Sequence, residues 1–171
     1  MNKGLLIVYT GDGKGKTTAG LGSALRAYGR GMRVALLYFL KDANQGEISA
    51  IQKLDGFDTM VFGAGRFIDF DNIQPSDVEP IKEGLQKLSE TLQTESYDMV
   101  VLDEILITVY YGLVPVSELL RILDTRKNTH IIVTGRYAAS EIVENADIVS
   151  EIGTIKHHFD QGASCIEGIE Y

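Results

Sequence analysis

A glycine-rich segment between an apolar strand and a helix constrains this chain more than any other feature. Residues 10–18 read Thr-Gly-Asp-Gly-Lys-Gly-Lys-Thr-Thr and follow the short apolar run of residues 5–8. Glycines let the backbone turn tightly and point several N–H groups at one spot, and the N-terminus of the next helix adds partial positive charge. In a phosphate-binding loop of the form G-x-x-x-x-G-K-[ST], the lysine neutralises phosphate charge and the hydroxyl binds the accompanying metal. The segment therefore predicts binding of a nucleoside triphosphate.

The match to this pattern is complete at its core and altered at its start. Gly15, Lys16 and Thr17 occupy the G-K-[ST] positions, whereas Thr10 stands at the first glycine position and Gly11 follows one residue late. A glycine-rich turn that binds nothing is the alternative interpretation. The loop residues that we expect to contact the nucleotide are Thr10, Gly11, Asp12, Gly13, Lys14, Gly15, Lys16, Thr17 and Thr18.

Size, charge and cysteine content narrow the class of protein. The 171 residues, 44% of them hydrophobic, can bury one sizeable core, so we expect a single domain over residues 1–171. The net charge of −8 argues against nucleic-acid or anionic-membrane partners. Cys165 is the only cysteine, which leaves no intramolecular disulfide and no cysteine-based zinc site. No apolar run is long enough to cross a bilayer and no signal-peptide-like segment precedes the first one, so we expect a cytoplasmic protein.

Apolar runs and helical periodicities alternate along the chain. We expect strands at residues 5–8, 33–40, 58–62, 97–102, 130–133 and 147–152, the last of them in a central position of the sheet. Helices are expected at residues 16–28, 48–54, 76–92, 104–111, 115–123 and 140–146, with Ser76 and Glu79 resembling a capping box. Strand–helix–strand order implies parallel pairing. The sequence therefore predicts an α/β fold of the P-loop NTPase-like (RecA-like) class, with a mostly parallel sheet and helices on both faces.

Two acidic residues follow a buried strand. Asp103 and Glu104 come directly after four apolar residues, the Walker B arrangement. Ligands of open α/β sheets bind at the carboxyl ends of strands, which places this pair beside the phosphate-binding loop. Carboxylates there can hold Mg²⁺ directly or through water. A solvated helix N-terminus with acidic residues favoured by the dipole is the alternative.

A third strand end carries a basic residue. Thr134-Gly135-Arg136 follows the strand expected at residues 130–133 and so lies on the same rim. An arginine there can bind a phosphate with two parallel hydrogen bonds. A surface ion pair in an acidic protein is the other interpretation.

Four segments together resemble one family across nearly the whole chain. They read T-G-D-G-K-G-K-T-T-A-G-L-G, Y-D-M-V-V-L-D-E, T-G-R and K-H-H-F-D-x-G-x-x-x-x-x-G-I-E-Y. In this order they are similar to the ATP:corrinoid adenosyltransferases of the CobA/CobO/BtuR type, and the second loop lysine, Lys14, is more specific than a bare P-loop. The resemblance implies transfer of the 5′-deoxyadenosyl group of ATP to a reduced cobalt(I) corrinoid, with release of triphosphate, in adenosylcobalamin biosynthesis or salvage.

The same resemblance implies roles for residues and partners. Lys16, Thr17, Glu104 and Arg136 become the expected catalytic residues, and Thr17 and Glu104, with Asp103 nearby, the expected ligands of Mg²⁺ or Mn²⁺. ATP is thought to bind in the reverse sense along the loop in this family, which fits the altered position at Thr10. The expected assembly is a homodimer that works with a flavodoxin-like reductant.

Two departures from the family concern the corrinoid. Relatives often carry an N-terminal extension that helps to close the active site, whereas this chain begins at the first strand. They also often place a Phe and a Trp over the corrin face, in the loop before the long helix. Phe67 matches the Phe, while Asp69 stands at the Trp position with Phe70 beside it. We expect Phe67 and Phe70 either to cover the corrinoid or to pack beneath the irregular loop of residues 63–75.

Two other classes of function compete with adenosyl transfer. A P-loop kinase or ATPase could act on another small substrate, although the chain shows no arginine-rich cluster of the kind that closes over the γ-phosphate in kinases of this size. A nucleotide-binding regulatory module with negligible turnover is the second alternative. The product separates them: triphosphate indicates adenosyl transfer, ADP indicates phosphoryl transfer, and neither indicates a binding module.

Overall fold

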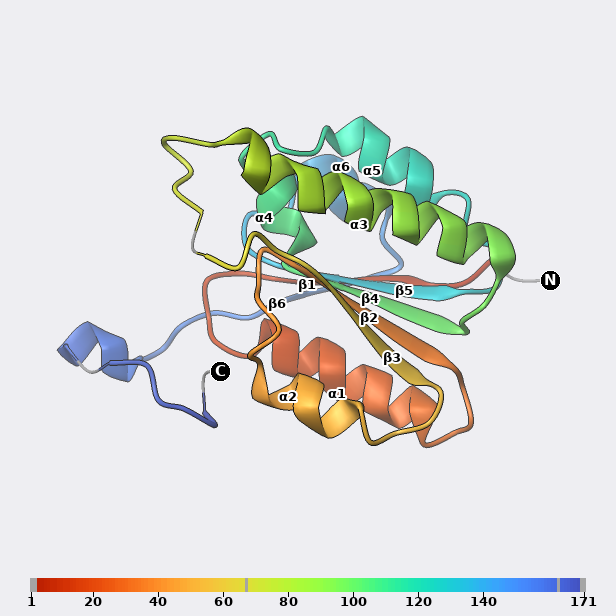
Figure 1. Cartoon of the computed structure of the whole chain (residues 1–171), viewed down its shortest axis with the longest axis horizontal. Coiled ribbons are helices and arrows are strands. Elements are labelled where there is room, and N and C mark those ends of the chain that lie inside the picture. The colour runs from red at the N-terminus through yellow and green to blue at the C-terminus, as the bar shows by residue number, and fades with distance from the viewer. Residues whose placement is uncertain (1–2, 67, 163, 170–171) are drawn as a thin grey trace.

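The computed structural model describes residues 3–66, 68–162 and 164–169 and is organised around one parallel sheet. Its six strands lie in the order β3-β2-β4-β5-β1-β6, and every neighbouring pair is parallel (Figure 1). The predicted α/β architecture with a parallel sheet is confirmed. The strands are β1 (Leu6–Thr10), β2 (Val34–Phe39), β3 (Phe57–Phe62), β4 (Met99–Asp103), β5 (His130–Thr134) and β6 (Ile148–Glu151).

Helices cover both faces of this sheet, as parallel strands require crossover connections. One face carries α1 (Lys16–Tyr28) and α2 (Gly46–Ile51) (Figure 1). The opposite face carries α3 (Pro75–Thr94), α4 (Ile105–Tyr110), α5 (Val116–Leu123) and α6 (Ser140–Asn145). After β6 the chain leaves the sheet, and the described part of this tail contains one short 3₁₀ helix, η1 (His158–Gln161).

Strand β2 shows how the sheet separates two cores. All its residues are buried, with Ala35, Leu37 and Phe39 in the core under α3 to α6. Val34, Leu36 and Tyr38 point to the other face and pack with α1 and α2. Successive side chains of a strand point to opposite faces, so a strand covered on both sides reads as a continuous apolar run.

The position expected for the last strand is wrong. Among the described residues β6 pairs only with β1 and forms an edge of the sheet, with Ile148 and Val149 exposed. An apolar run of this length indicates extended structure but carries no information on how many neighbours the strand has.

The predicted capping box is displaced by two residues. Helix α3 begins at Pro75, and Gln74 and Asp77 form the reciprocal pair of a capping box. Proline is favoured in the first turn of a helix because its missing N–H has no partner there in any case. Ser76 therefore lies inside the first turn.

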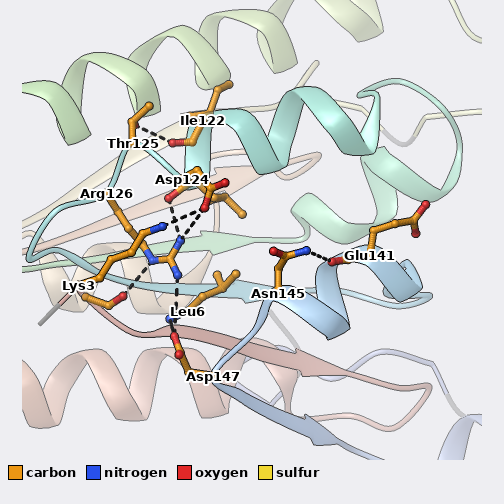
Figure 2. A network of polar contacts seen from close by, with 11 residues as sticks. Lys3, Leu6, Ile122, Asp124, Thr125, Arg126, Glu141, Asn145 and Asp147 are labelled. Atoms are coloured by element: carbon orange, nitrogen blue, oxygen red, sulfur yellow. Dashed lines mark hydrogen bonds and ion pairs between the residues drawn. The ribbon is translucent and has the colours of Figure 1, made fainter.

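A polar network fixes the sheet at the amino ends of its strands (Figure 2). The buried guanidinium of Arg126, after α5, donates to the carbonyl oxygens of Gly4 and Leu123, both at 2.9 Å. It also lies 3.8 Å from Asp147, whose carboxylate accepts from the backbone N–H of Leu6 at 2.7 Å. This network joins α5, β1 and β6, and it leaves the opposite, carboxyl ends of the strands for the loops described next.

Candidate functional site

The glycine-rich loop turns against the end of the edge strand. The N–H of Gly13 donates to the carbonyl oxygen of Ile152 at 2.7 Å. A Cβ on Gly13 would lie 2.6 Å from the carbonyl oxygen of Gly153, so no side chain fits there. Gly11 adopts φ 100°, in the left-handed region that favours glycine. Thr10 still belongs to β1, which explains why the first glycine comes one residue late.

Lys16, the first residue of α1, is held close to the loop. Its side chain is buried, with 7% of the residue exposed, and Nζ donates to the carbonyl oxygen of Gly13 at 2.7 Å. Burial lowers the pKa of the Lys16 ammonium, and Arg136 contributes in the same direction against the opposing charge of Glu104. A phosphate oxygen would replace the Gly13 carbonyl as the acceptor and compensate the buried charge.

Asp103 ends β4 and is the most constrained carboxylate of the site, with 0% of the residue exposed. Its Oδ1 accepts from Thr134 Oγ1 at 2.6 Å, and its Oδ2 accepts from Thr17 Oγ1 at 3.2 Å. Asp103 Oδ2 also accepts from Lys41 Nζ at 2.6 Å. These contacts join the ends of β4 and β5, the start of α1 and the segment after β2.

Glu104 follows in a left-handed backbone conformation, with φ 62°. Its Oε2 is buried and has no hydrogen-bond partner among the described residues. Burial and the neighbouring charge of Asp103 raise the pKa of the Glu104 carboxyl, against the opposing charges of Lys41, Lys16 and Arg136. A non-glycine residue at positive φ and an unpaired buried oxygen are both unfavourable and are typical of functional sites.

The side-chain oxygen atoms of this site are suitable ligands for a small divalent cation. The Thr17 hydroxyl and the Asp103 carboxylate are in contact, and the unpaired Glu104 oxygen lies in the adjoining residue. Mg²⁺ prefers such oxygen ligands and is commonly held by one or two carboxylates together with substrate phosphates. In the part of the chain that the structure describes, no group of three or more His, Cys, Asp and Glu is arranged to hold a metal. The remaining ligands would therefore come from the nucleotide or from water.

Lys41 is a site residue that the sequence interpretation missed. It follows β2, and its Nζ contacts Asp103 Oδ2 at 2.6 Å and Thr17 Oγ1 at 3.1 Å. Burial alone lowers the pKa of this ammonium, but the charge of Asp103 and its hydrogen bond outweigh burial, so the pKa is raised. The signal that could have identified Lys41 is its position directly after a strand whose carboxyl end lies on the same rim as the phosphate-binding loop.

An open cavity of about 1070 Å³ lies at this rim. Glu104 and Arg136 line it together with most of the loop residues predicted to bind the nucleotide, from Asp12 to Thr18. The lining does not include Thr10 or Gly11, and Asp103 lies beneath it, behind Thr17 and Lys41. Arg136 is exposed and donates a long hydrogen bond, 3.5 Å, to the carbonyl oxygen of Asp12.

The segment after β6 forms another wall of the cavity. Thr154, His157 and Phe159 line it, as do residues 165, 168 and 169. Lys14 Nζ donates to the carbonyl oxygen of Ile169 at 2.7 Å, so this loop lysine contacts the tail. No periodicity marks this tail in the sequence, so its place beside the loop could not be inferred from the residue pattern.

The predicted aromatic residues lie outside the cavity lining or outside the described residues. Phe67 belongs to the latter. Phe70 is half-buried and stacks on Tyr111, with ring centroids 3.8 Å apart and planes at 9°. Tyr111 in turn meets Tyr110 edge to face, and Tyr110 packs on Tyr137. These rings form a partly exposed aromatic row beside α4.

The sequence as a whole matches a known family. The family model described as "ATP:corrinoid adenosyltransferase BtuR/CobO/CobP" matches residues 2–171. The chain belongs to this adenosyltransferase family. The predicted resemblance and enzyme class are therefore confirmed.

Individual members of the adenosyltransferase family match over nearly the whole of this chain. The chain is 38% identical over 171 residues to a corrinoid adenosyltransferase of Escherichia coli (strain K12), covering 99% of this chain and 86% of that one. It is 37% identical over 173 residues to a corrinoid adenosyltransferase of Sinorhizobium, covering 99% and 81%. It is 36% identical over 171 residues to the corrinoid adenosyltransferase CobA of Salmonella typhimurium (strain LT2), covering 99% and 86%.

The fold of this adenosyltransferase is also similar to that of a solved structure. The flagellar accessory protein FlaH from Methanocaldococcus jannaschii superposes with a TM-score of 0.57 at 18% sequence identity, covering 88% of this chain and 72% of that one. At this identity the likeness concerns the fold alone, and it agrees with the predicted α/β fold that has a parallel sheet and helices on both faces. In residues 3–66, 68–162 and 164–169 no helix has both the length and the apolar character needed to cross a membrane.

Proposed function

We propose that this protein transfers the 5′-deoxyadenosyl group of ATP to the cobalt(I) of a reduced corrinoid and releases triphosphate. One observation carries the proposal: the glycine-rich loop, Lys16 and Glu104 line one cavity, with Thr17 and Asp103 in contact at its base. This arrangement suits an anionic triphosphate with a divalent cation. Membership of the adenosyltransferase family then favours adenosyl transfer over phosphoryl transfer from the same nucleotide.

The reaction is a displacement at the C5′ carbon of ATP. The cobalt(I) of the substrate donates an electron pair to C5′, the cobalt–carbon bond forms, and the C5′–O bond breaks with its pair leaving on triphosphate. The cobalt is thereby oxidised to cobalt(III). Because the nucleophile arrives with the substrate, the protein supplies in-line positioning and stabilisation of the leaving group.

The residues of the cavity have distinct tasks in this proposal. Loop amides and Lys16 hold the phosphates, and Lys16 exchanges its Gly13 carbonyl acceptor for a phosphate oxygen. Arg136, exposed at the rim, adds positive charge near the same group. Loss of any of these donors would leave more negative charge uncompensated on the departing triphosphate.

Thr17, Asp103 and Glu104 would hold Mg²⁺ or Mn²⁺ in the proposed enzyme. Bound there, the cation would supply charge neutralisation to the leaving triphosphate. The unpaired, buried Oε2 of Glu104 supports this assignment, because a carboxylate oxygen without a partner is unfavourable unless a ligand completes the site.

The aromatic side chains of the irregular loop are proposed to cover the corrinoid. Phe67 would lie over the corrin face, helped by Phe70, in place of the Trp that Asp69 replaces. Phe70 stacks on Tyr111, directly after α4, so in this proposal Phe70 would assist by holding the loop in position. Aromatic rings give large apolar cover for each residue used.

The cellular setting is part of the same proposal. The enzyme would act as a homodimer in the cytoplasm, in adenosylcobalamin biosynthesis or salvage, with a flavodoxin-like protein supplying electrons for cobalt reduction. Ultracentrifugation tests the assembly. Replacing the chemical reductant of the assay below by a reduced flavodoxin tests the electron donor.

Anaerobic incubation with ATP, Mg²⁺ and a chemically reduced corrinoid tests the activity. We expect the optical spectrum of an alkylated corrinoid to appear together with one triphosphate for each corrinoid converted. ADP in place of triphosphate would indicate a kinase or ATPase, and an unchanged nucleotide pool would indicate a binding module. A parallel reaction with Lys16→Ala shows whether the turnover belongs to this site.

A further inference from the structure

Lys41 occupies the position between Thr17 and Asp103, two of the three side chains proposed as ligands of the divalent cation. Its Nζ lies 2.6 Å from Asp103 Oδ2 and 3.1 Å from Thr17 Oγ1, and the latter atom lies 3.2 Å from Asp103 Oδ2. Mg²⁺ takes its oxygen ligands at about 2.0–2.1 Å. An ammonium and a divalent cation cannot share these oxygens, because both need the same lone pairs and repel each other at such a separation.

The backbone before and around Lys41 is shaped to put its side chain there. Leu40, the residue after β2, has φ 65°, a left-handed conformation that is uncommon for a non-glycine residue. Gly63 packs so tightly on this turn that a Cβ there would overlap the carbonyl oxygen of Lys41. Both features turn the chain at the end of β2 and direct Lys41 over the end of β4.

The Lys41 ammonium lies next to open space into which it can rotate. The Lys41 side chain is 22% exposed and lines the cavity, whereas the Asp103 side chain that it contacts is fully buried. Its Nζ also lies over the Tyr38 ring, 5.6 Å from the ring centroid, so the ammonium has an aromatic neighbour beside the cavity. A rotation about the flexible lysine stem brings the charge from Asp103 to the cavity in which the triphosphate is proposed to bind.

We propose that Lys41 is an exchangeable cation of this site. It holds the Thr17–Asp103 pair when the divalent cation is absent, and it yields these oxygens to the metal that arrives with the nucleotide. Its ammonium then contacts phosphate oxygens in the cavity. The inference rests on the proposed metal role of Thr17 and Asp103, and it adds an order of binding: the metal binds together with the triphosphate and only weakly alone.

Mn²⁺ binding, measured by water-proton relaxation with the purified protein, tests this order without using turnover. We expect weak binding of Mn²⁺ alone to the wild type and strong binding once ATP is present. Lys41→Met removes the competing charge but keeps the stem, so its affinity for Mn²⁺ alone should rise roughly tenfold or more, as loss of a charge-assisted hydrogen bond implies. Lys41→Arg keeps the charge and should bind Mn²⁺ alone as weakly as the wild type.

Two controls define the site. Lys82→Met removes the same charge from the exposed face of α3 and should leave Mn²⁺ affinity unchanged. Thr17→Ala in the Lys41→Met background should abolish the gained affinity, because it removes a proposed ligand. Equal Mn²⁺ affinity in Lys41→Met and wild type would overturn the exchange proposal while leaving the metal role of Thr17 and Asp103 intact.

The wild type alone keeps the proposal testable if Lys41→Met does not fold. Mn²⁺ affinity that is as high without ATP as with it would overturn the proposed order. Absence of protein-bound Mn²⁺ even with ATP would instead overturn the metal assignment, and the exchange role of Lys41 with it. Mn²⁺ binding in the presence of ATP distinguishes the two failures: it is retained if only the order of binding is wrong, and it is absent if the metal assignment is wrong.

Discussion

Thr134 and Asp103 are joined by a short hydrogen bond, 2.6 Å from Oγ1 to Oδ1, across neighbouring strands β5 and β4. The same hydroxyl oxygen accepts from the backbone N–H of Glu104 at 3.1 Å. One threonine therefore fixes both the carboxylate of Asp103 and the left-handed turn that presents Glu104. Thr17 and Lys41 donate to the other carboxylate oxygen, Oδ2. Within the described residues, Thr134 is therefore the hydrogen-bond donor on which Oδ1 depends.

Thr134→Val should lower both stability and turnover. The substitution keeps the shape but leaves Asp103 Oδ1 buried without a donor, which costs about 1–3 kcal/mol. Thr134→Ser keeps the hydroxyl and should retain most of the activity. Urea unfolding and adenosylation rates measure the two effects, and a fully stable, fully active Thr134→Val would show that this bond does not position the pair.

Lys16→Ala and Thr17→Ala should each reduce adenosylation by about 10²–10³-fold, the usual effect of losing one stabilising contact to a leaving group. The reasons differ, because Lys16 supplies charge to the phosphates and Thr17 a proposed metal ligand. Excess Mg²⁺ should therefore restore part of the activity of Thr17→Ala but none of that of Lys16→Ala. Near wild-type turnover at saturating ATP and Mg²⁺ in either variant would remove the phosphate-loop assignment.

Glu104→Gln should stabilise the ligand-free protein while raising the Mg²⁺ concentration needed for activity. Folding raises the pKa of Glu104 above its ordinary value of 4.5, so the ionised carboxylate disfavours the folded state. This penalty is absent below the unfolded-state pKa, where both states are protonated, and is complete above the folded-state pKa. The stability gained by the variant should thus be largest at neutral pH and vanish as the pH falls through that window.

Thermal unfolding at several pH values measures this difference. Each kcal/mol gained corresponds to about 2–4 °C for a chain of this size. Glu79→Gln, on the exposed surface of α3, is the matched control and should show no such dependence. A pH-independent difference between Glu104→Gln and wild type would mean that the Glu104 charge is not disfavoured by folding.

Phe67→Ala should lower corrinoid turnover and weaken corrinoid binding while leaving ATP affinity nearly intact. The expected cause is loss of apolar cover over the corrin face. A core role for the side chain predicts another pattern, a loss of about 3–5 kcal/mol of stability with both substrates affected together. Melting temperature, ATP affinity and turnover of this variant separate the two cases.

Arg126→Met should destabilise the protein without changing the chemistry of the site. The guanidinium bonds two backbone carbonyls at the amino ends of the strands, and loss of such charge-assisted bonds costs about 1.5–3 kcal/mol. Urea unfolding should therefore shift to lower concentration. The ATP affinity of the folded protein should be unchanged, and a specific loss of ATP binding would contradict the separation of this network from the cavity.

Local sequence determines where the glycine-rich loop and the acidic pair lie in the fold. The glycine-rich loop and the pair Asp103–Glu104 are each specified within a few residues, since a buried run followed by polar residues defines a strand end. The rim they share follows from parallel topology alone. The alternation of strands and helices predicted the α/β architecture, because each of these elements is also marked by its own local sequence.

Contacts between distant segments account for what the sequence did not reveal. Lys41 reaches Asp103 only because β2 and β4 are neighbours in the sheet, and the tail borders the cavity only because β6 pairs with β1. Phe70 meets Tyr111 across two segments that carry no common motif. Short apolar runs specify extended structure, but neighbours are set by the packing of the whole chain.

The junction of the loop with Ile152 has a kinetic consequence. The N–H of Ile152 donates to the carbonyl oxygen of Thr10, and its carbonyl oxygen accepts from Gly13. The chain then continues into the wall to which residues 154, 157, 159, 165, 168 and 169 contribute. That wall is tethered through Ile152 to the loop proposed to bind the phosphates, so its effective concentration at the cavity depends on the length of the connecting chain as well as on its own affinity. In the proposed enzyme, a tail displaced by an entering substrate would stay tethered beside the cavity, so its return would need no diffusional search.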